Sequence, residues 1–154
     1  MVQRALVLLC VGCMAVFMAS CGQTYVLQSI TVAPKTFNLE GLDTVQALTV
    51  TAHYSNTKTE DVTVKSTFQV GQATALTNPN TPNGAVSVSL SGTVQTSPTV
   101  YACTWLTTST ANGYTYSETS PYVVTASYAG FQDTAAVYVA SLSSCYDGTG
   151  HLHP

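Results

Sequence analysis

The sequence predicts an all-β protein, a sandwich of two sheets built from about seven to nine short strands. Apolar and polar residues alternate with a period of two, and no stretch after residue 20 keeps the 3.6-residue helical period over three turns. Clusters of Pro, Gly and Asn separate the alternating runs at short intervals. Thr and Ser number 40 of the 154 residues, and β-branched Thr and Val suit a half-buried pleated strand.

The first half of the predicted sandwich contains three alternating runs. Residues 29–33 form the first run, which Pro34 ends. Residues 48–54 form the second, with one apolar and one polar face, and the polar turn 55–58 follows it. Residues 62–70 form the third. The apolar positions of the three runs are Ile30, Val32, Leu48, Val50, Ala52, Tyr54, Val62, Val64, Phe68 and Val70.

The middle of the chain is predicted to add a hairpin or long loop. Strands are expected at 85–94, where Val86, Val88 and Leu90 alternate with Ser, and at 99–106. Asn112-Gly113 is a good hairpin tip, because both residue types tolerate positive φ.

Two further strands close the predicted sandwich. Residues 123–128 and 136–140 both alternate, and Ala129-Gly130 supplies a turn between them. Their apolar faces carry Val124, Ala126, Tyr128, Val137 and Val139.

Charge is scarce along the whole chain. Four Lys and Arg and seven Asp and Glu make up 7% of the residues, whereas a soluble domain averages about 25%. The net charge of −3 leaves no basic patch, which argues against nucleic acid as a partner. Without residues 1–20 the charged fraction is unchanged, so the deficit belongs to the folded domain, whose wet faces are expected to carry Thr and Ser.

The first twenty residues have the form of an export signal. Arg4 precedes the apolar stretch 5–19, which is shorter than the roughly 20 residues of a membrane-spanning helix, and small residues follow. Residues 1–20 are therefore predicted to be a signal peptide. An ordinary secretory signal and an uncleaved anchor are the alternatives.

The end of this signal resembles the lipobox of bacterial lipoproteins, Met18-Ala19-Ser20-Cys21, although Met18 stands where Leu is usual. The resemblance implies cleavage after Ser20, a diacylglyceryl group on the Cys21 thiol and acylation of the new N-terminus. More than one acyl chain gives stable membrane anchoring. The expected organisation is a signal peptide at 1–20, a lipidated N-terminus and short linker at 21–25, the sandwich domain at 26–141 and a polar tail at 142–154.

Two cysteines remain after the leader and the lipidated residue are set aside. Cys103 and Cys145 form an even pair in an exported chain, so a disulfide is predicted between them. It would close a loop of about 43 residues, stabilise the fold by about 4 kcal/mol and pin the tail onto the sheet. Two buried free thiols and a metal site are the alternative readings.

Both ends of the predicted domain resemble the bacterial Ig-like domain, group 2. The opening segments are Leu27–Pro34, Leu48–Tyr54 and Asp61-Val62-Thr63, with Phe68 where the family often has Trp. Residues 122–139 resemble the closing pair of strands. The resemblance implies an Ig-like sandwich, while residues 71–120 are longer than the corresponding family segment. It carries over no catalytic residue and no cofactor.

Polar residues offer weak candidates for chemistry. His53 is expected to be a solvated strand residue, since no base or nucleophile accompanies it. His151 and His153 could hold a metal with Asp147, but a frayed tail is the preferred interpretation, so no metal site is predicted. The remaining carboxylates lack the spacing of a Ca²⁺ loop. They are Glu40, Asp43, Glu60, Asp61, Glu118 and Asp133.

Aromatic residues gather in or beside the central region. Tyr and Trp combine rigid contact area with a hydrogen-bonding group, which suits protein or sugar contacts. Cross-strand pairing and core packing are the alternative roles. The possible recognition surface consists of Tyr101, Trp105, Tyr114, Tyr116 and Tyr122.

These features predict a non-enzymatic, lipid-anchored Ig-like domain of the bacterial cell envelope, at the outer membrane or cell surface. It would act in adhesion or as a structural module that binds a protein or glycan. An accessory or assembly subunit of an envelope complex is the alternative, and a hydrolase with an unrecognised site in residues 71–120 is a weaker one. Gly22 after the lipidated Cys resembles the pattern for outer-membrane sorting.

Overall fold

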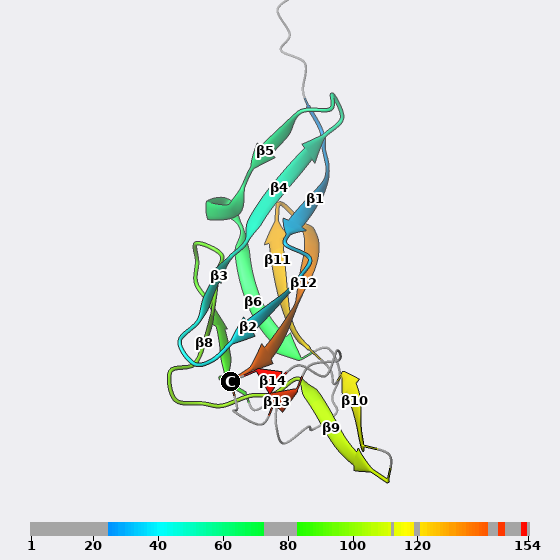
Figure 1. Ribbon diagram of the computed structural model, residues 1–154. Coiled ribbons are helices and arrows are strands. Elements are labelled where there is room, and N and C mark those ends of the chain that lie inside the picture. The colour runs from blue at the N-terminus through cyan, green and yellow to red at the C-terminus, as the bar shows by residue number, and fades with distance from the viewer. Residues whose placement is uncertain are drawn as a thin grey trace, which may run out of the picture.

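The computed structural model describes residues 25–72, 83–111, 113–118, 121–141, 145–146 and 152–153 of the chain. These residues form an all-β sandwich, as the sequence predicts (Figure 1). Ten strands make up its two layers, slightly more than the seven to nine expected.

The first layer contains two three-stranded sheets, and Leu48 connects a strand of one to a strand of the other. One sheet has the order β1 (Leu27–Ala33), β4 (Thr49–Tyr54) and β5 (Thr59–Asp61), and the other has the order β3 (Val45–Ala47), β8 (Thr93–Thr96) and β7 (Val86–Val88). The backbone N–H of Leu48, between β3 and β4, donates to the carbonyl of Gly92 at 2.9 Å. All pairings in this layer are antiparallel.

The second layer is a single sheet in the order β2 (Thr36–Glu40), β12 (Phe131–Ala140), β11 (Tyr122–Tyr128) and β6 (Thr67–Gln72). The β2 strand, which the alternation pattern did not identify, runs parallel to β12. The chain thus crosses from the first layer to the second between Ala33 and Thr36, through a cis peptide bond at Pro34.

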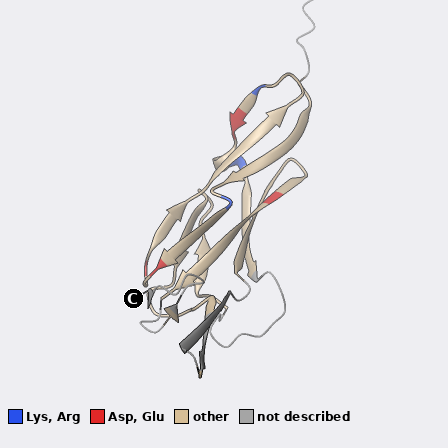
Figure 2. Ribbon diagram, turned by 45° about the vertical axis from the view of Figure 1, so that its right-hand side comes forward, with Lys and Arg blue, Asp and Glu red and all other residues tan. Residues whose placement is uncertain are grey.

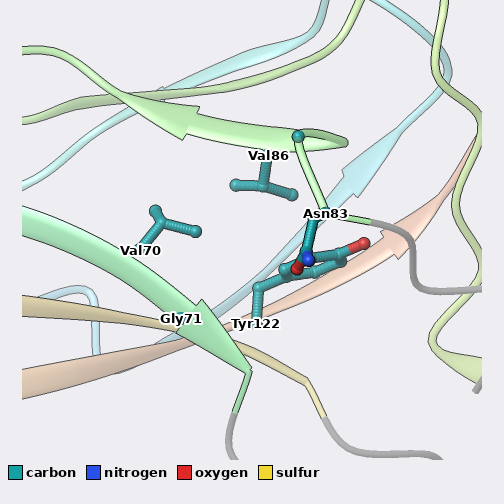
Figure 3. Close-up of a pocket in the computed structure, with 6 residues that line it drawn as sticks. Val70, Gly71, Asn83, Val86 and Tyr122 are labelled. Atoms are coloured by element: carbon teal, nitrogen blue, oxygen red, sulfur yellow. The ribbon is translucent and has the colours of Figure 1, made fainter. Parts of the chain in front are cut away.

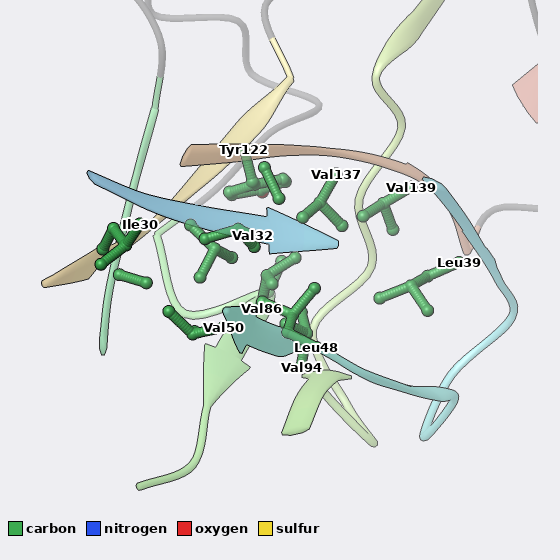
Figure 4. Packing of buried hydrophobic residues seen from close by; sticks show 14 of the residues in the cluster. Ile30, Val32, Leu39, Leu48, Val50, Val86, Val94, Tyr122, Val137 and Val139 are labelled. Atoms are coloured by element: carbon green, nitrogen blue, oxygen red, sulfur yellow. The ribbon is translucent and has the colours of Figure 1, made fainter. Parts of the chain in front are cut away.

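The core lies between the two layers, where the inward-facing residues of both sheets meet (Figure 4). Most of them are Val and Ala, and several are completely buried. Branched and small side chains fill the space between pleated strands at high density, so removal of a methyl group here leaves a void. The fully buried members of the cluster are Val50, Ala52, Val62, Ala85, Val94, Ala102, Val124, Ala126, Val137 and Val139.

The third alternating run begins with a helical turn instead of a strand. Thr63–Lys65 form a 3-10 helix, and β6 starts only at Thr67. The carboxylate of Asp61 accepts the backbone N–H of Thr63 at 2.9 Å and its hydroxyl at 2.6 Å, which bends the chain. Val64 consequently points outward and is 80% exposed.

The expected strand at 85–94 is a tight hairpin. The β7 and β8 strands pair with each other across a turn that contains Leu90, which is 85% exposed. Gly92 adopts φ +78°, and the Ser89 hydroxyl accepts the N–H of Thr93 at 3.0 Å. The alternation of Val and Ser continued through the turn, so it did not reveal the reversal.

The expected strand at 99–106 begins later than predicted. The β9 strand covers Trp105–Thr110, and β10 covers Gly113–Glu118. Before β9, Cys103 is not part of a strand and pairs with Ala140 in an isolated antiparallel bridge. The predicted tail contributes β13 (Cys145–Tyr146) and β14 (Leu152–His153), which pair antiparallel.

Candidate interaction surface

A β-hairpin extends from one end of the sandwich. Its strands β9 and β10 pair antiparallel from Trp105 and Glu118 to Thr110 and Gly113, so the turn lies between Thr110 and Gly113. Gly113, predicted to form the tip with Asn112, is instead the first residue of β10. Figure 1 shows this hairpin at the end of the molecule opposite to the start of β1. The chain thus enters the domain at one end, and the added hairpin forms the other.

A disulfide and two aromatic rings hold the base of the hairpin. The predicted bond between Cys103 and Cys145 is formed, with 5.8 Å between the two Cα atoms. Trp105, the first residue of β9, is 5% exposed, and its ring centroid lies 5.3 Å from that of Tyr138 on β12. With Ala140 these residues form a small second core, which connects the C-terminal segment, the hairpin and the sandwich.

Hydroxyl groups complete the connection between the hairpin base and β12. Thr104 is fully buried, and its Oγ1 accepts the backbone N–H of Val139 at 2.8 Å. The Ser141 hydroxyl accepts the N–H of Ala102 at 2.6 Å and donates to the carbonyl of Ala102 at 3.0 Å. Thr and Ser are therefore not confined to the outer faces, because inside the molecule their hydroxyls also satisfy backbone groups beside the bridge between Cys103 and Ala140.

The five aromatic residues proposed for recognition do not share one exposed surface. Tyr101 is 53% exposed, in the loop before the hairpin. Trp105 and Tyr122 are both buried, and burial raises the pKa of the Tyr122 phenol to about 12. Tyr114 and Tyr116 lie in β10, but their side chains are outside the described part of the structure.

A small pocket opens at the edge of the sandwich between β6 and β7. Its volume is about 220 Å³, below the usual range for small-molecule sites of roughly 300–1,000 Å³. Val70, Val86 and Tyr122 provide apolar walls, Asn83 provides an amide, and two glycines complete the lining (Figure 3). These lining residues include no carboxylate and no imidazole, and the Tyr122 phenol is the titratable side chain among them.

The two described histidines, His53 and His153, lie in different sheets. His53 Nε2 and the Thr31 hydroxyl are 2.8 Å apart across β1 and β4, on the exposed face. His153 lies in β14 opposite Cys145, whereas His151 and Asp147 are outside the described residues. No group of three His, Cys, Asp or Glu residues that could hold a metal occurs within the part of the chain that the structure describes.

Charged groups in the described residues serve local structure (Figure 2). Lys35 pairs with Asp133, and Lys65 pairs with Glu60. The bond from Lys65 lowers the pKa of Glu60, and the bonds from the Thr63 hydroxyl and N–H lower the pKa of Asp61. These pKa shifts arise from hydrogen bonds within turns and strands, so they do not indicate a binding cleft.

Comparison with known proteins supplies no relative: no protein-family model and no curated protein matches this chain. The resemblance to the group 2 Ig-like domain thus stays a prediction from the residues. Among the described residues no helix is long and apolar enough to cross a membrane.

The hairpin base was only partly visible in the sequence. The cysteine count predicted the disulfide, whereas Asn112-Gly113 predicted the turn only to within one residue, because Gly113 already belongs to β10. Tyr138 and Thr104 carried no local signal, because their roles depend on partners more than thirty residues away in the chain.

Proposed function

We propose that the protein is a lipid-anchored, non-catalytic module of the bacterial cell envelope that contacts a protein or glycan through its β9–β10 end. One observation carries this proposal: the hairpin lies at the end of the sandwich opposite to the point where the chain enters from Cys21. A domain tethered at its entry end presents the opposite end outward.

The construction of the hairpin base supports a presenting role. A lone two-stranded hairpin is marginally stable in water. Here the disulfide and the buried Trp105 fix its first strand to the sandwich. A preorganised contact surface loses less conformational entropy when it binds. With few charges nearby, contacts would depend on hydroxyls, aromatic groups and backbone, and association would gain little from charge steering.

Site-specific photo-crosslinking in intact cells tests the contact. A photoreactive residue in place of Tyr116, in the hairpin, should give adducts with an envelope protein or glycan. The same residue in place of Leu90, which is 85% exposed on the β7–β8 turn, is the matched control and should give none. Equal adducts from the two positions, or none from the hairpin, contradict the proposed contact.

Deletion of the hairpin provides the corresponding loss of function. Trp105 and Glu118 are directly paired, so Asn-Gly can join them in place of residues 106–117. The shortened protein should keep its disulfide and its membrane association but should no longer co-purify with the partner that the cross-link identifies. For the anchor itself, the mature protein should begin at Cys21, and Cys21→Ser should move it from the detergent phase to the aqueous phase.

A further inference from the structure

The entry of the chain is fastened to the turn between β4 and β5. The Ser55 hydroxyl accepts the backbone N–H of Val26 at 3.3 Å, and the Ser55 N–H donates to the carbonyl of Val26 at 2.9 Å. In the next pair of the ladder, Leu27 lies opposite Tyr54. Residues 25–26 and the turn 55–58 therefore form one continuous end of the sandwich, which we name the entry end.

The turn at the entry end is preformed. The N–H of Tyr54 donates to the carbonyl of Lys58 at 2.9 Å, and the N–H of Thr57 donates to the carbonyl of Tyr54 at 3.0 Å. The Asn56 side chain accepts the N–H of Lys58 at 3.1 Å. These bonds hold all four turn residues in one exposed arrangement.

The entry end exposes two apolar side chains next to a cation. Tyr25 is 46% exposed and Val26 is 64% exposed, side by side in the sequence. Lys58 is the one charged residue among 25–26 and 55–58, and its ammonium lies 5.8 Å from the centre of the Tyr54 ring. A Tyr and an aliphatic residue beside a Lys are the combination that favours the boundary between lipid headgroups and acyl chains.

The length of the linker places this surface close to a membrane. Four residue steps separate Cys21 from Tyr25, and an extended chain covers at most about 14 Å over four steps. The polar headgroup region is itself roughly 5–8 Å thick on each side of a bilayer. Acyl chains on Cys21 would thus hold the entry end within a short distance of the headgroups.

We infer that the entry end is a membrane-contact surface that rests on the phospholipid headgroup layer, with Tyr25 and Val26 at the interface and Lys58 toward the lipid phosphates. This inference rests on the proposed lipid anchor at Cys21. Contact at this end would orient the sandwich away from the membrane and point the hairpin outward.

Headgroup quenching of a fluorophore tests the contact in the lipidated protein. Thr57→Cys places a label in the turn, and Thr99→Cys places one on the loop near the hairpin base. Both positions are exposed. The introduced thiol is the one available for labelling, because Cys103 and Cys145 are joined and the Cys21 thiol would carry the diacylglyceryl group. The labelled proteins are reconstituted into phosphatidylcholine and phosphatidylglycerol vesicles that contain a lipid with a nitroxide on its headgroup.

We expect roughly threefold or stronger quenching at position 57 than at position 99, since a headgroup nitroxide acts only at short range from the interface. Replacing both Tyr25 and Val26 by Ser should reduce quenching at 57 toward the level at 99. Val45→Ser is the matched control: Val45 is also exposed, at 60%, but lies in β3, and its substitution should change nothing.

The outcomes separate this inference from the proposed anchor. Protein that floats with the vesicles but is quenched equally at 57 and 99 overturns the membrane contact and leaves the anchor in place. Protein that fails to float overturns both. If the double Ser variant were quenched as strongly as the parent at position 57, the tether alone would account for the proximity, and the assigned contact would also be wrong.

Discussion

The buried hydroxyl of Thr104 accepts a hydrogen bond from the backbone N–H of Val139 at 2.8 Å, across 35 residues of sequence. The N–H of Thr104 in turn donates to the carbonyl of Val139 at 2.9 Å. One threonine thus satisfies both backbone groups of Val139, next to the isolated antiparallel bridge between Cys103 and Ala140.

Replacement of Thr104 by Val, which keeps the shape but removes the hydroxyl, should lower the free energy of unfolding by about 1–3 kcal/mol, because the N–H of Val139 would be buried without this partner. Urea denaturation provides the measurement. Thr134→Val is the control, since Thr134 is exposed on the outer face of β12 and its replacement should change the stability by less than about 0.5 kcal/mol. Equal effects of the two substitutions would contradict the role of the Thr104 hydroxyl.

Loss of the disulfide should lower the free energy of unfolding by up to about 4 kcal/mol, because the bond closes a long loop in the unfolded chain. The Cys103→Ala, Cys145→Ala double variant should show this loss in denaturant titrations. Reduction of the parent protein should produce a similar change, whereas the double variant should be insensitive to reductant. Alkylation of both thiols in the untreated native protein would show that the bond does not form.

Gly92→Ala should be much more damaging than Gly130→Ala, although both glycines have positive φ. A Cβ at Gly92 would lie 3.0 Å from Phe68 Cζ and 3.1 Å from Thr63 Cγ2, whereas a Cβ at Gly130 would meet nothing within 4 Å. The left-handed backbone costs about 1–2 kcal/mol at either site, and crowding adds about 1–3 kcal/mol at Gly92 alone. Thermal unfolding of the two variants measures the difference in stability that crowding at Gly92 causes. Equal losses of stability in the two variants would show that crowding contributes nothing.

Much of the sandwich could be predicted because its strands obey local rules. In β1, β4, β11 and β12 one face is buried and the other faces solvent. Apolar and polar residues therefore alternate along these strands with the two-residue period of the pleat. Two positions where prediction failed are ones where a single residue redirects the backbone. Asp61 bends the chain at Thr63, and Gly92 lies in the β7–β8 turn where the chain reverses, while apolar and polar residues continue to alternate through both.

The candidate surface was less predictable than the fold. A cluster of aromatic residues in sequence does not distinguish a contact face from a core, and Trp105 and Tyr122 are buried because β9 and β11 carry them into separate packed clusters. The turn 55–58 of the entry end was predicted, but its contact with the start of the domain was not, since that contact depends on hydrogen bonds between Val26 and Ser55, which are 29 residues apart.

The interaction of Asp133 with Lys35 should make part of the stability depend on pH. Partial burial acts to raise the pKa of the Asp133 carboxyl, but the bonds from Lys35 and from the backbone N–H of Val32 outweigh it and hold the pKa below its ordinary value of 3.8. A carboxyl with a lowered pKa in the folded state contributes stability above its unfolded pKa. That contribution is lost as the pH falls through the folded pKa.

Asp133→Asn should therefore be less stable than the parent at pH 6, and the difference between the two should shrink as the pH is lowered from about 4 toward 2. Urea titrations over this range provide the measurement. Lys35→Gln serves as the control, because it removes the ion pair but leaves the 2.7 Å bond from the Val32 N–H, so it should reproduce only part of the effect. A stability difference between Asp133→Asn and the parent that stays constant down to pH 2 would show that the carboxylate charge contributes nothing.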